Sequence, residues 1–131
     1  MDAPSNTDTA AVPADLRFWC DLAGGDEEAA RDLLTLYLGD TSEQISLIVS
    51  ALAGGRADQV GRAAHACAGS SGTCGVDTLA ELFRRLEQQA RTNRLDELSA
   101  TLPLVVEAFN DVRARLTKTI LASSEAIQEP L

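Results

Sequence analysis

Aromatic residues, histidine and long apolar runs are scarce in this 131-residue chain. It holds one tryptophan, one tyrosine, three phenylalanines and one histidine. No apolar stretch approaches the roughly 18 residues that a membrane-spanning helix needs. The N-terminal segment MDAPSNTDTAAVPAD has neither the basic nor the apolar region of a signal peptide. We therefore expect a cytoplasmic protein without a membrane partner.

Cysteine is also sparse, and its spacing limits the chemistry that the chain can support. Cys20, Cys67 and Cys74 form no CxxC pair, and with a single histidine a zinc site would need carboxylates to complete it. We therefore expect no metal site. Cys67 and Cys74 are seven residues apart, on one stripe of a helix, which is typical of small buried residues. The alternative is a redox-sensitive stripe in a four-helix structural or oligomerisation domain.

The formal net charge of −9 argues against nucleic acid or an anionic membrane as a partner. This charge is unevenly distributed along the chain. Residues 56–94 hold six arginines against four acidic residues, a net charge of +2, so the remainder carries −11. We expect the partner that meets residues 56–94 to be negatively charged.

Hydrophobic residues make up 45% of the chain and aromatic residues only 4%. This composition predicts a core of leucine, alanine and valine in an all-α fold. Long amphipathic segments with short connections predict an antiparallel four-helix bundle with an additional short N-terminal helix. We expect a disordered leader at residues 1–13, the bundle at 14–121 and a flexible tail at 122–131.

Start and stop signals divide the bundle into its elements. The helices are expected at residues 15–22, 26–53, 57–72, 77–91 and after Asn93. Asp26 is suited to cap the second of them, whose apolar stripe is broken near residues 39–41. Pro103 lies inside the apolar pattern of the last helix, and it either kinks that helix or marks its true start.

The only histidine, His65, lies in the stretch AAHACAGSSGTCG, among unusually small residues. A helical wheel separates this segment into an inward face and an outer face that carries His65. The inward residues are Val60, Ala64, Cys67, Ser71 and Cys74. The residues beside His65 on the outer face are Gly61, Gly69 and Gly72, with Asp58, Arg62 and Ala68 close by.

The three outer glycines call for an explanation, because a glycine inside an exposed helix costs about 0.8–1 kcal/mol relative to alanine. A functional explanation is that bare backbone lets the surface of another protein reach the histidine closely. The alternative is that the glycines pack against a neighbouring helix, or that the helix ends early near Gly69.

The segment AAHACAGSSGTCGVDTLAELFRRLEQQAR resembles the signature of histidine-containing phosphotransfer (HPt) domains, and its flanks extend the similarity over about residues 14–120. The shared positions are Ala64, His65, Gly69, Ser70, Ser71, Gly75, Leu79, Leu86 and Glu87. The resemblance implies a phosphoprotein of a two-component phosphorelay. His65 would accept a phosphoryl group from the aspartyl phosphate of a receiver domain, or from a histidine kinase, and pass it to another response-regulator receiver.

We expect a monomer, because the bare surface around His65 is needed by transient partners. The same resemblance implies that the chain has no kinase or ATP site. It also implies that the chain needs no cofactor of its own, since the partner receiver supplies Mg²⁺.

Glu87 is expected to orient the imidazole. In an antiparallel hairpin that turns near residues 74–75, residues 84–87 return alongside His65. A carboxylate that accepts a hydrogen bond from Nδ1–H fixes the tautomer that leaves Nε2 free. The similar phosphoacceptor domain of chemotaxis kinases carries a glutamate at this spacing. The alternative is a solvated surface glutamate.

One position departs from the family pattern, which has a lysine three residues after the histidine where this chain has Ala68. Arg62, Arg84 and Arg91 are candidates for the missing positive charge, and we favour Arg84 or Arg62. The predicted phosphoryl- or partner-binding residues are Gly61, Arg62, Ala68, Gly69, Gly72, Arg84 and Arg91. The alternative function is a transfer-inactive module of the same fold that binds and regulates a kinase or receiver.

Overall fold

The computed structural model describes residues 16–128, with side chains as far as residue 121. Within this part the chain is helical and contains no strand. Its helices are α2 (Leu16–Leu22), α3 (Glu27–Ala53), α4 (Ala57–Thr73), α5 (Asp77–Arg91) and α6 (Leu95–Gln128). None of the helices in this described part combines the length and apolarity that crossing a bilayer requires. The leader expected at residues 1–13 lies outside the described residues.

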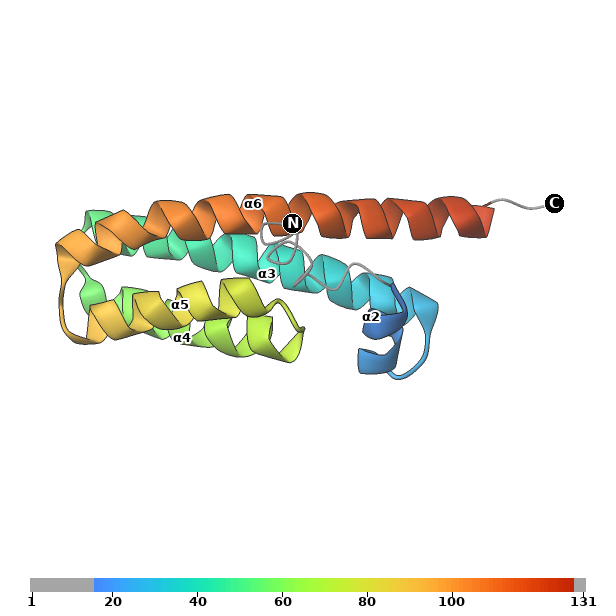
Figure 1. Ribbon diagram of the computed structural model, residues 1–131, viewed down its shortest axis with the longest axis horizontal. Coiled ribbons are helices and arrows are strands. Elements are labelled where there is room, and N and C mark those ends of the chain that lie inside the picture. The colour runs from blue at the N-terminus through green and yellow to red at the C-terminus, as the bar shows by residue number, and fades with distance from the viewer. Residues whose placement is uncertain (1–15, 129–131) are drawn as a thin grey trace, which may run out of the picture.

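The four long helices run alternately in opposite directions, each beside the next in sequence (Figure 1). α3 packs against α4 and α6, and α5 packs against the same two neighbours, so the helices form a ring around one core. α2 packs on α3, at the end of the bundle where the α4–α5 hairpin turns. The predicted all-α antiparallel bundle with a short N-terminal helix is confirmed.

Helix boundaries follow local signals in the sequence. Asp26 has an extended backbone, and its Oδ2 accepts a hydrogen bond from the backbone N of Ala29 at 3.2 Å, which caps α3. Asn93, with a φ of 58°, makes the turn between α5 and α6, a left-handed conformation that asparagine tolerates. The predicted boundaries of α5, Asp77 and Arg91, are those observed.

α3 is one helix, as expected, but burial along it differs in part from its apolar stripe. The helix is continuous through residues 39–41, and Thr41 is buried there. Val49 is apolar but exposed, whereas the nearby Ile48 and Ala51 are buried. The buried arc of α3 is determined by where α4 and α6 contact it, and a sequence stripe does not contain that information.

α6 is longer and more continuous than its sequence pattern indicates. It begins at Leu95 and passes through Pro103, so Pro103 does not mark its start. Proline deprives the carbonyl four residues earlier of its helical donor. That residue, Ser99, is exposed, as is Pro103, so the carbonyl lies where water can bind it. The helix continues to Gln128, beyond the boundary expected at residue 121.

Aromatic residues of α2 close one end of the bundle. Trp19 is fully buried, and its ring lies 6.2 Å from that of Tyr37 on α3. Phe18 lies over Gly75, where the α4–α5 hairpin turns. Between α3 and α4, the hydroxyl groups of Tyr37 and Ser71 make a buried hydrogen bond of 2.7 Å. These contacts hold the helix that carries the histidine against α2 and α3.

The two cysteines of the apolar stripe are both free and buried, with Cys67 2% exposed and Cys74 6% exposed. Burial raises the pKa of the Cys67 thiol to about 12, and the negative charge of Asp40 adds to this increase. Burial also raises the pKa of Cys74. Because the thiolate is the reactive form, the interpretation of these residues as a redox-sensitive stripe is wrong.

Candidate functional site

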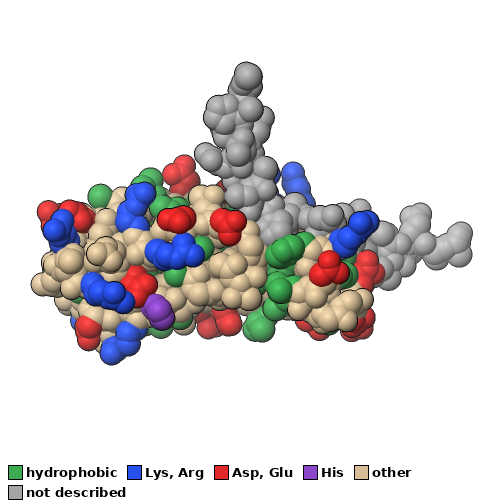
Figure 2. Space-filling view, turned by 60° about the horizontal axis from the view of Figure 1, so that its bottom comes forward, with side chains coloured by type: hydrophobic (Ala, Val, Ile, Leu, Met, Phe, Trp, Pro, Cys, Tyr) green, Lys and Arg blue, Asp and Glu red, His purple; other side chains and the backbone are tan. Residues whose placement is uncertain are grey.

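His65 lies near the middle of α4, on the face directed away from the core. Its side chain is 75% exposed, whereas Val60, Ala64 and Cys67 on the opposite side of the helix are buried. Figure 2 shows the histidine at the surface, with both basic and acidic side chains around it. The outward orientation predicted for His65 is therefore observed.

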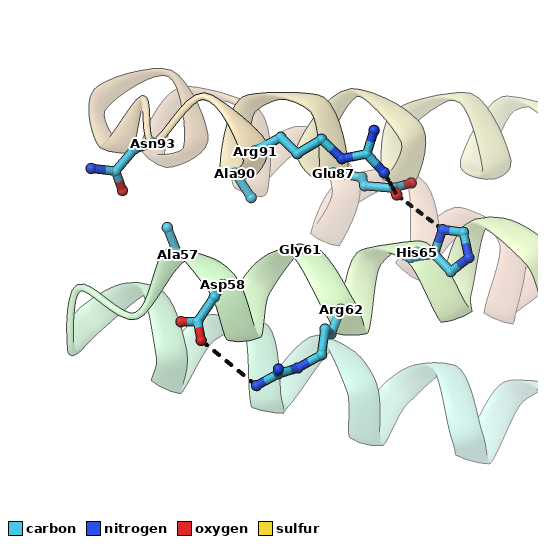
Figure 3. A pocket seen from close by; sticks show the side chains of 9 residues that line it. All are labelled: Ala57, Asp58, Gly61, Arg62, His65, Glu87, Ala90, Arg91 and Asn93. Carbon is cyan, nitrogen blue, oxygen red and sulfur yellow. Dashed lines mark hydrogen bonds and ion pairs between the residues drawn. The ribbon is translucent and has the colours of Figure 1, made fainter.

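The antiparallel course of α4 and α5 brings Glu87 beside His65. His65 Nδ1 and Glu87 Oε2 are 2.9 Å apart (Figure 3). An ionised carboxylate only accepts hydrogen bonds, so Nδ1–H is the donor, and in a neutral ring Nε2 then carries the free lone pair. The Glu87 side chain is only 17% exposed. The interpretation of Glu87 as a solvated surface glutamate is wrong.

Arg91 completes a chain of three side chains. Its NH2 group donates to Glu87 Oε2 at 2.8 Å, so the same oxygen accepts from His65 and from Arg91. Arg91 lies one turn after Glu87 on α5, at a spacing where side chains of a helix meet. Arg91, which we did not favour among the three candidate arginines, is therefore the one bound to the carboxylate that orients His65.

Two hollows between α4 and α5 flank this chain of side chains. We call them the Gly61 hollow and the Gly69 hollow. The Gly61 hollow is also lined by Ala57, Asp58, Arg62, Ala90 and Asn93. The Gly69 hollow is also lined by Ala68, Gly72, Thr73, Arg84 and Gln88. His65, Glu87 and Arg91 line both of them.

The imidazole ring is oriented toward one of these hollows. In Figure 3, Nε2 of His65 points away from Glu87 and away from Ala57 and Gly61, along α4 toward its C-terminal end. The Gly69 hollow lies on that side. The lone pair of the neutral ring is therefore directed to the C-terminal half of α4.

The two arginines favoured from the sequence lie on different sides of the ring. Arg62 extends toward Asp58, with an N–O distance of 3.7 Å, on the side of the Gly61 hollow (Figure 3). Arg84 lines the Gly69 hollow, and its NH2 group lies 3.7 Å from the position that a Cβ at Gly72 would take. Glu81 is its ion-pair partner, at 3.4 Å. Of these two arginines, Arg84 is therefore the one that lies on the side of the ring toward which Nε2 of His65 points.

The three outer glycines have different environments. A Cβ at Gly61 would lie 3.3 Å from Cβ of Ala90, so Gly61 lets α4 and α5 approach closely. At this position the packing explanation is correct. A Cβ at Gly69 would meet nothing within 4 Å, and α4 continues to Thr73, so neither packing nor an early helix end explains Gly69.

Ala68 requires a correction. The wheel places it on the outer face, but its side chain is only 7% exposed and belongs to the hydrophobic core. α4 packs against both α3 and α5, so its buried arc is wider than one inward direction predicts. Ala68 lies on the α5 side, at the Gly69 hollow that Arg84 also lines.

The hollows also include residues that the sequence pattern does not mark as site residues. Ala57, Ala90 and Asn93 line the Gly61 hollow, and Gln88 lines the Gly69 hollow. The available signal was the four-residue spacing of Ala57 and Gly61, which places small residues on one side of α4. In the described part of the chain, no group of three or more His, Cys, Asp or Glu side chains is arranged to hold a metal ion.

Comparison with known proteins agrees with this geometry. The family model of the Hpt domain matches residues 32–118, so the chain belongs to the Hpt domain family. Among solved structures it is similar to histidine-containing phosphotransfer protein B from Pseudomonas aeruginosa, with 25% identity and a TM-score of 0.75, over 81% of this chain and 92% of the other. No curated protein sequence matches significantly. The predicted family is confirmed, and histidine phosphotransfer in phosphorelays is its general function.

Proposed function

We propose that His65 is the phosphoacceptor of a phosphorelay intermediate. In this proposal, Nε2 accepts a phosphoryl group from the aspartyl phosphate of a receiver domain, or from a histidine kinase, and passes it to another receiver. The observation that carries the proposal is the 2.9 Å contact between His65 Nδ1 and Glu87 Oε2 on a ring that is 75% exposed. This arrangement pairs a fixed tautomer with an accessible nucleophile.

The chemistry balances without a proton leaving Nε2. The Nε2 lone pair attacks phosphorus, and the N–P bond forms as the P–O bond to the donor aspartate breaks. The electron pair of that bond leaves with the aspartate carboxylate. The ring gains positive charge, which Glu87 stabilises through the hydrogen bond to Nδ1–H. Transfer to a second receiver reverses the same step.

Arg84 is the cation that we assign to the phosphoryl oxygens. It lines the Gly69 hollow, toward which Nε2 points, and Ala68 lines the same hollow where the family pattern has lysine. An arginine from α5 thereby brings positive charge to the hollow that lacks the lysine of α4. Arg62 is paired with Asp58 on the other side of the ring. Gly69, whose missing side chain leaves open space, lets the partner approach.

The proposal assigns the remaining requirements to the partner. The receiver supplies the Mg²⁺ that transfer requires. The chain itself acts as a cytoplasmic monomer, which leaves its His65 face free for transient complexes. Residues 56–94 carry a net charge of +2 in a chain of −9, which favours a partner that is acidic around its phosphorylation site.

A transfer assay tests the proposal. Wild type and His65→Gln are incubated with a panel of phosphorylated receivers, and acid-labile label on the chain is measured. We expect label on the wild type and none on His65→Gln. In the same assay we expect Arg84→Gln to slow transfer by about 100-fold, the lower end of what loss of one charge-stabilising donor costs in enzymes. We expect Arg62→Gln to leave the rate unchanged. No label from any donor on a folded wild type would contradict the proposal.

The second candidate function is the transfer-inactive module that binds a kinase or receiver. The replacement of the usual lysine by Ala68 favours it. This function predicts a complex whose affinity is the same for wild type and His65→Gln, together with no label from any donor. Label on the wild type alone excludes it.

A further inference from the structure

Arg91 and Glu87 form an ion pair within this chain, so the pair exists before any partner protein binds. The pair joins residues four apart on α5, with the acidic residue first, which is the favourable order on a helix. The side chain of Glu87 is 17% exposed and that of Arg91 is 69% exposed, so the carboxylate is largely sheltered while the guanidinium faces solvent. The carboxylate oxygen that binds Arg91 at 2.8 Å is the one that lies 2.9 Å from His65 Nδ1.

We propose that Arg91 is a positioning residue for His65 and acts through Glu87. The inference rests on the proposed function of His65, and it adds a residue that determines how the nucleophile is held. Charge-assisted hydrogen bonds are shorter and stronger than neutral ones. Arg91 therefore holds the flexible glutamate side chain in the rotamer in which its Oε2 accepts the hydrogen bond from Nδ1–H of His65.

The neighbouring charges do not duplicate this role. On α4, Arg62 is paired with Asp58, and on α5, Arg84 is paired with Glu81. Only Arg91, among the arginines whose ion pairs are described here, donates to Glu87. Without Arg91, the carboxylate keeps His65 as its single described partner and can rotate toward water. The ring then loses the constraint that reserves Nε2 for attack.

A spectroscopic test follows from the single histidine of the chain, because its ¹⁵N signals report the protonation of His65 without assignment ambiguity. The unphosphorylated wild type is compared with Arg91→Gln, Arg91→Lys and Arg85→Gln. Arg85 is an exposed arginine of α5 outside both hollows, so its variant loses the same charge from the same helix. We expect the Nε2–H form to increase in Arg91→Gln, to be largely restored to the wild-type level in Arg91→Lys, and to be unchanged in Arg85→Gln.

Transfer kinetics provide the second test. We expect Arg91→Gln to lower the rate of label transfer about 10-fold. This is the lower end of the loss seen in metalloproteins when a residue that orients a metal-binding side chain is removed. If Arg91 acts through Glu87, adding Arg91→Gln to Glu87→Gln causes no further loss beyond about twofold. The inference is overturned if Arg91→Gln has the same tautomer population of His65 and the same rate of label transfer as Arg85→Gln. A full Arg91 effect in the Glu87→Gln background also overturns it, since Arg91 then acts directly on the phosphoryl group.

The two proposals fail in different ways. If the wild type accepts no label, the phosphoacceptor role of His65 fails, while the ¹⁵N comparison still decides whether Arg91 controls the tautomer. If the wild type accepts label and the Arg91 variants match the Arg85 variant, only the positioning role fails.

Discussion

At the scale of single residues, the orientation of one imidazole determines what the site can do. Nδ1 of His65 is bound by Glu87, and Nε2 points toward the C-terminal half of α4. The residues along that direction therefore have more influence on transfer than those on the opposite side. Gly69 lies there, one turn after His65, and nothing lies within 4 Å of where its Cβ would be.

Gly69→Ala is expected to stabilise the protein and impair its transfer. Alanine in an open helical position gains about 0.5–1 kcal/mol of unfolding free energy over glycine. The added methyl group enters the space that we assign to the approaching partner, and a misplacement of about 1 Å at a reacting centre costs up to roughly 100-fold in rate. Urea unfolding and the label-transfer assay measure the two effects.

Gly39→Ala is the matched control for this prediction. Gly39 lies inside α3, where a Cβ would also meet nothing within 4 Å. The Gly39→Ala variant should gain a similar free energy of unfolding, and it should accept label at the wild-type rate. Equal transfer rates for the two variants would show that the bare backbone at Gly69 has no part in the approach of the partner.

At the scale of elements, the site depends on how closely α4 and α5 pack and on how their hairpin is held. Gly61 allows α4 and α5 to approach closely at Ala90. Phe18 of α2 covers the turn of the hairpin at Gly75. α2 therefore supports the hairpin from the end opposite to the Gly61 hollow.

Gly75→Ala tests the support that α2 gives to the hairpin. Gly75 has a φ of 75°, and a Cβ there would lie 2.9 Å from the Phe18 ring. Backbone strain costs about 1–2 kcal/mol, and the displaced aromatic ring adds to that cost. Gly55→Ala is the control, because Gly55 has a φ of 72° and open space around its Cβ position. In urea unfolding we expect the larger loss for Gly75→Ala, with altered fluorescence of Trp19. Equal losses would show that Phe18 does not constrain the turn.

At the scale of the whole molecule, the core holds acidic groups in their protonated form. Burial raises the pKa of Tyr37 to about 12, while its hydrogen bond to Ser71 opposes the increase. Burial likewise raises the pKa of Cys67 to about 12. Both groups lose their protons more readily in the unfolded chain. There the pKa of a cysteine thiol is near 9.0 and that of a tyrosine hydroxyl is near 10.0.

The protein is therefore expected to lose stability in alkali. Above about pH 9 the unfolded state binds fewer protons than the native state, so the free energy of unfolding falls as the pH rises toward 12. Each group contributes a slope of up to about 1.4 kcal/mol per pH unit in that range. Urea unfolding at a series of pH values measures the slope, and Cys67→Ala should make it shallower between pH 9 and 10. A constant stability from pH 8 to 11 would contradict the prediction.

Most of the fold and part of the site could be predicted from the sequence. The capping role of Asp26 and the outward face of His65 depend on local geometry, which spacing along one helix describes. The role of Arg91 and the burial of Ala68 depend on contacts between α4 and α5. The direction in which an exposed arginine extends is not encoded in helical periodicity, because long side chains reach several neighbours from the same position.

The sequence by itself determined the helices, their order and the exposed histidine, because apolar periodicity and caps act within a few residues of the chain. Only the tertiary structure decided which groups surround that histidine. It placed Glu87 and Arg91 on one shared oxygen, separated Arg84 from Arg62 on two sides of the ring, and distinguished the packed Gly61 from the open Gly69. These relations arise between two helices, where the axial register and the distance of approach fix the contacts.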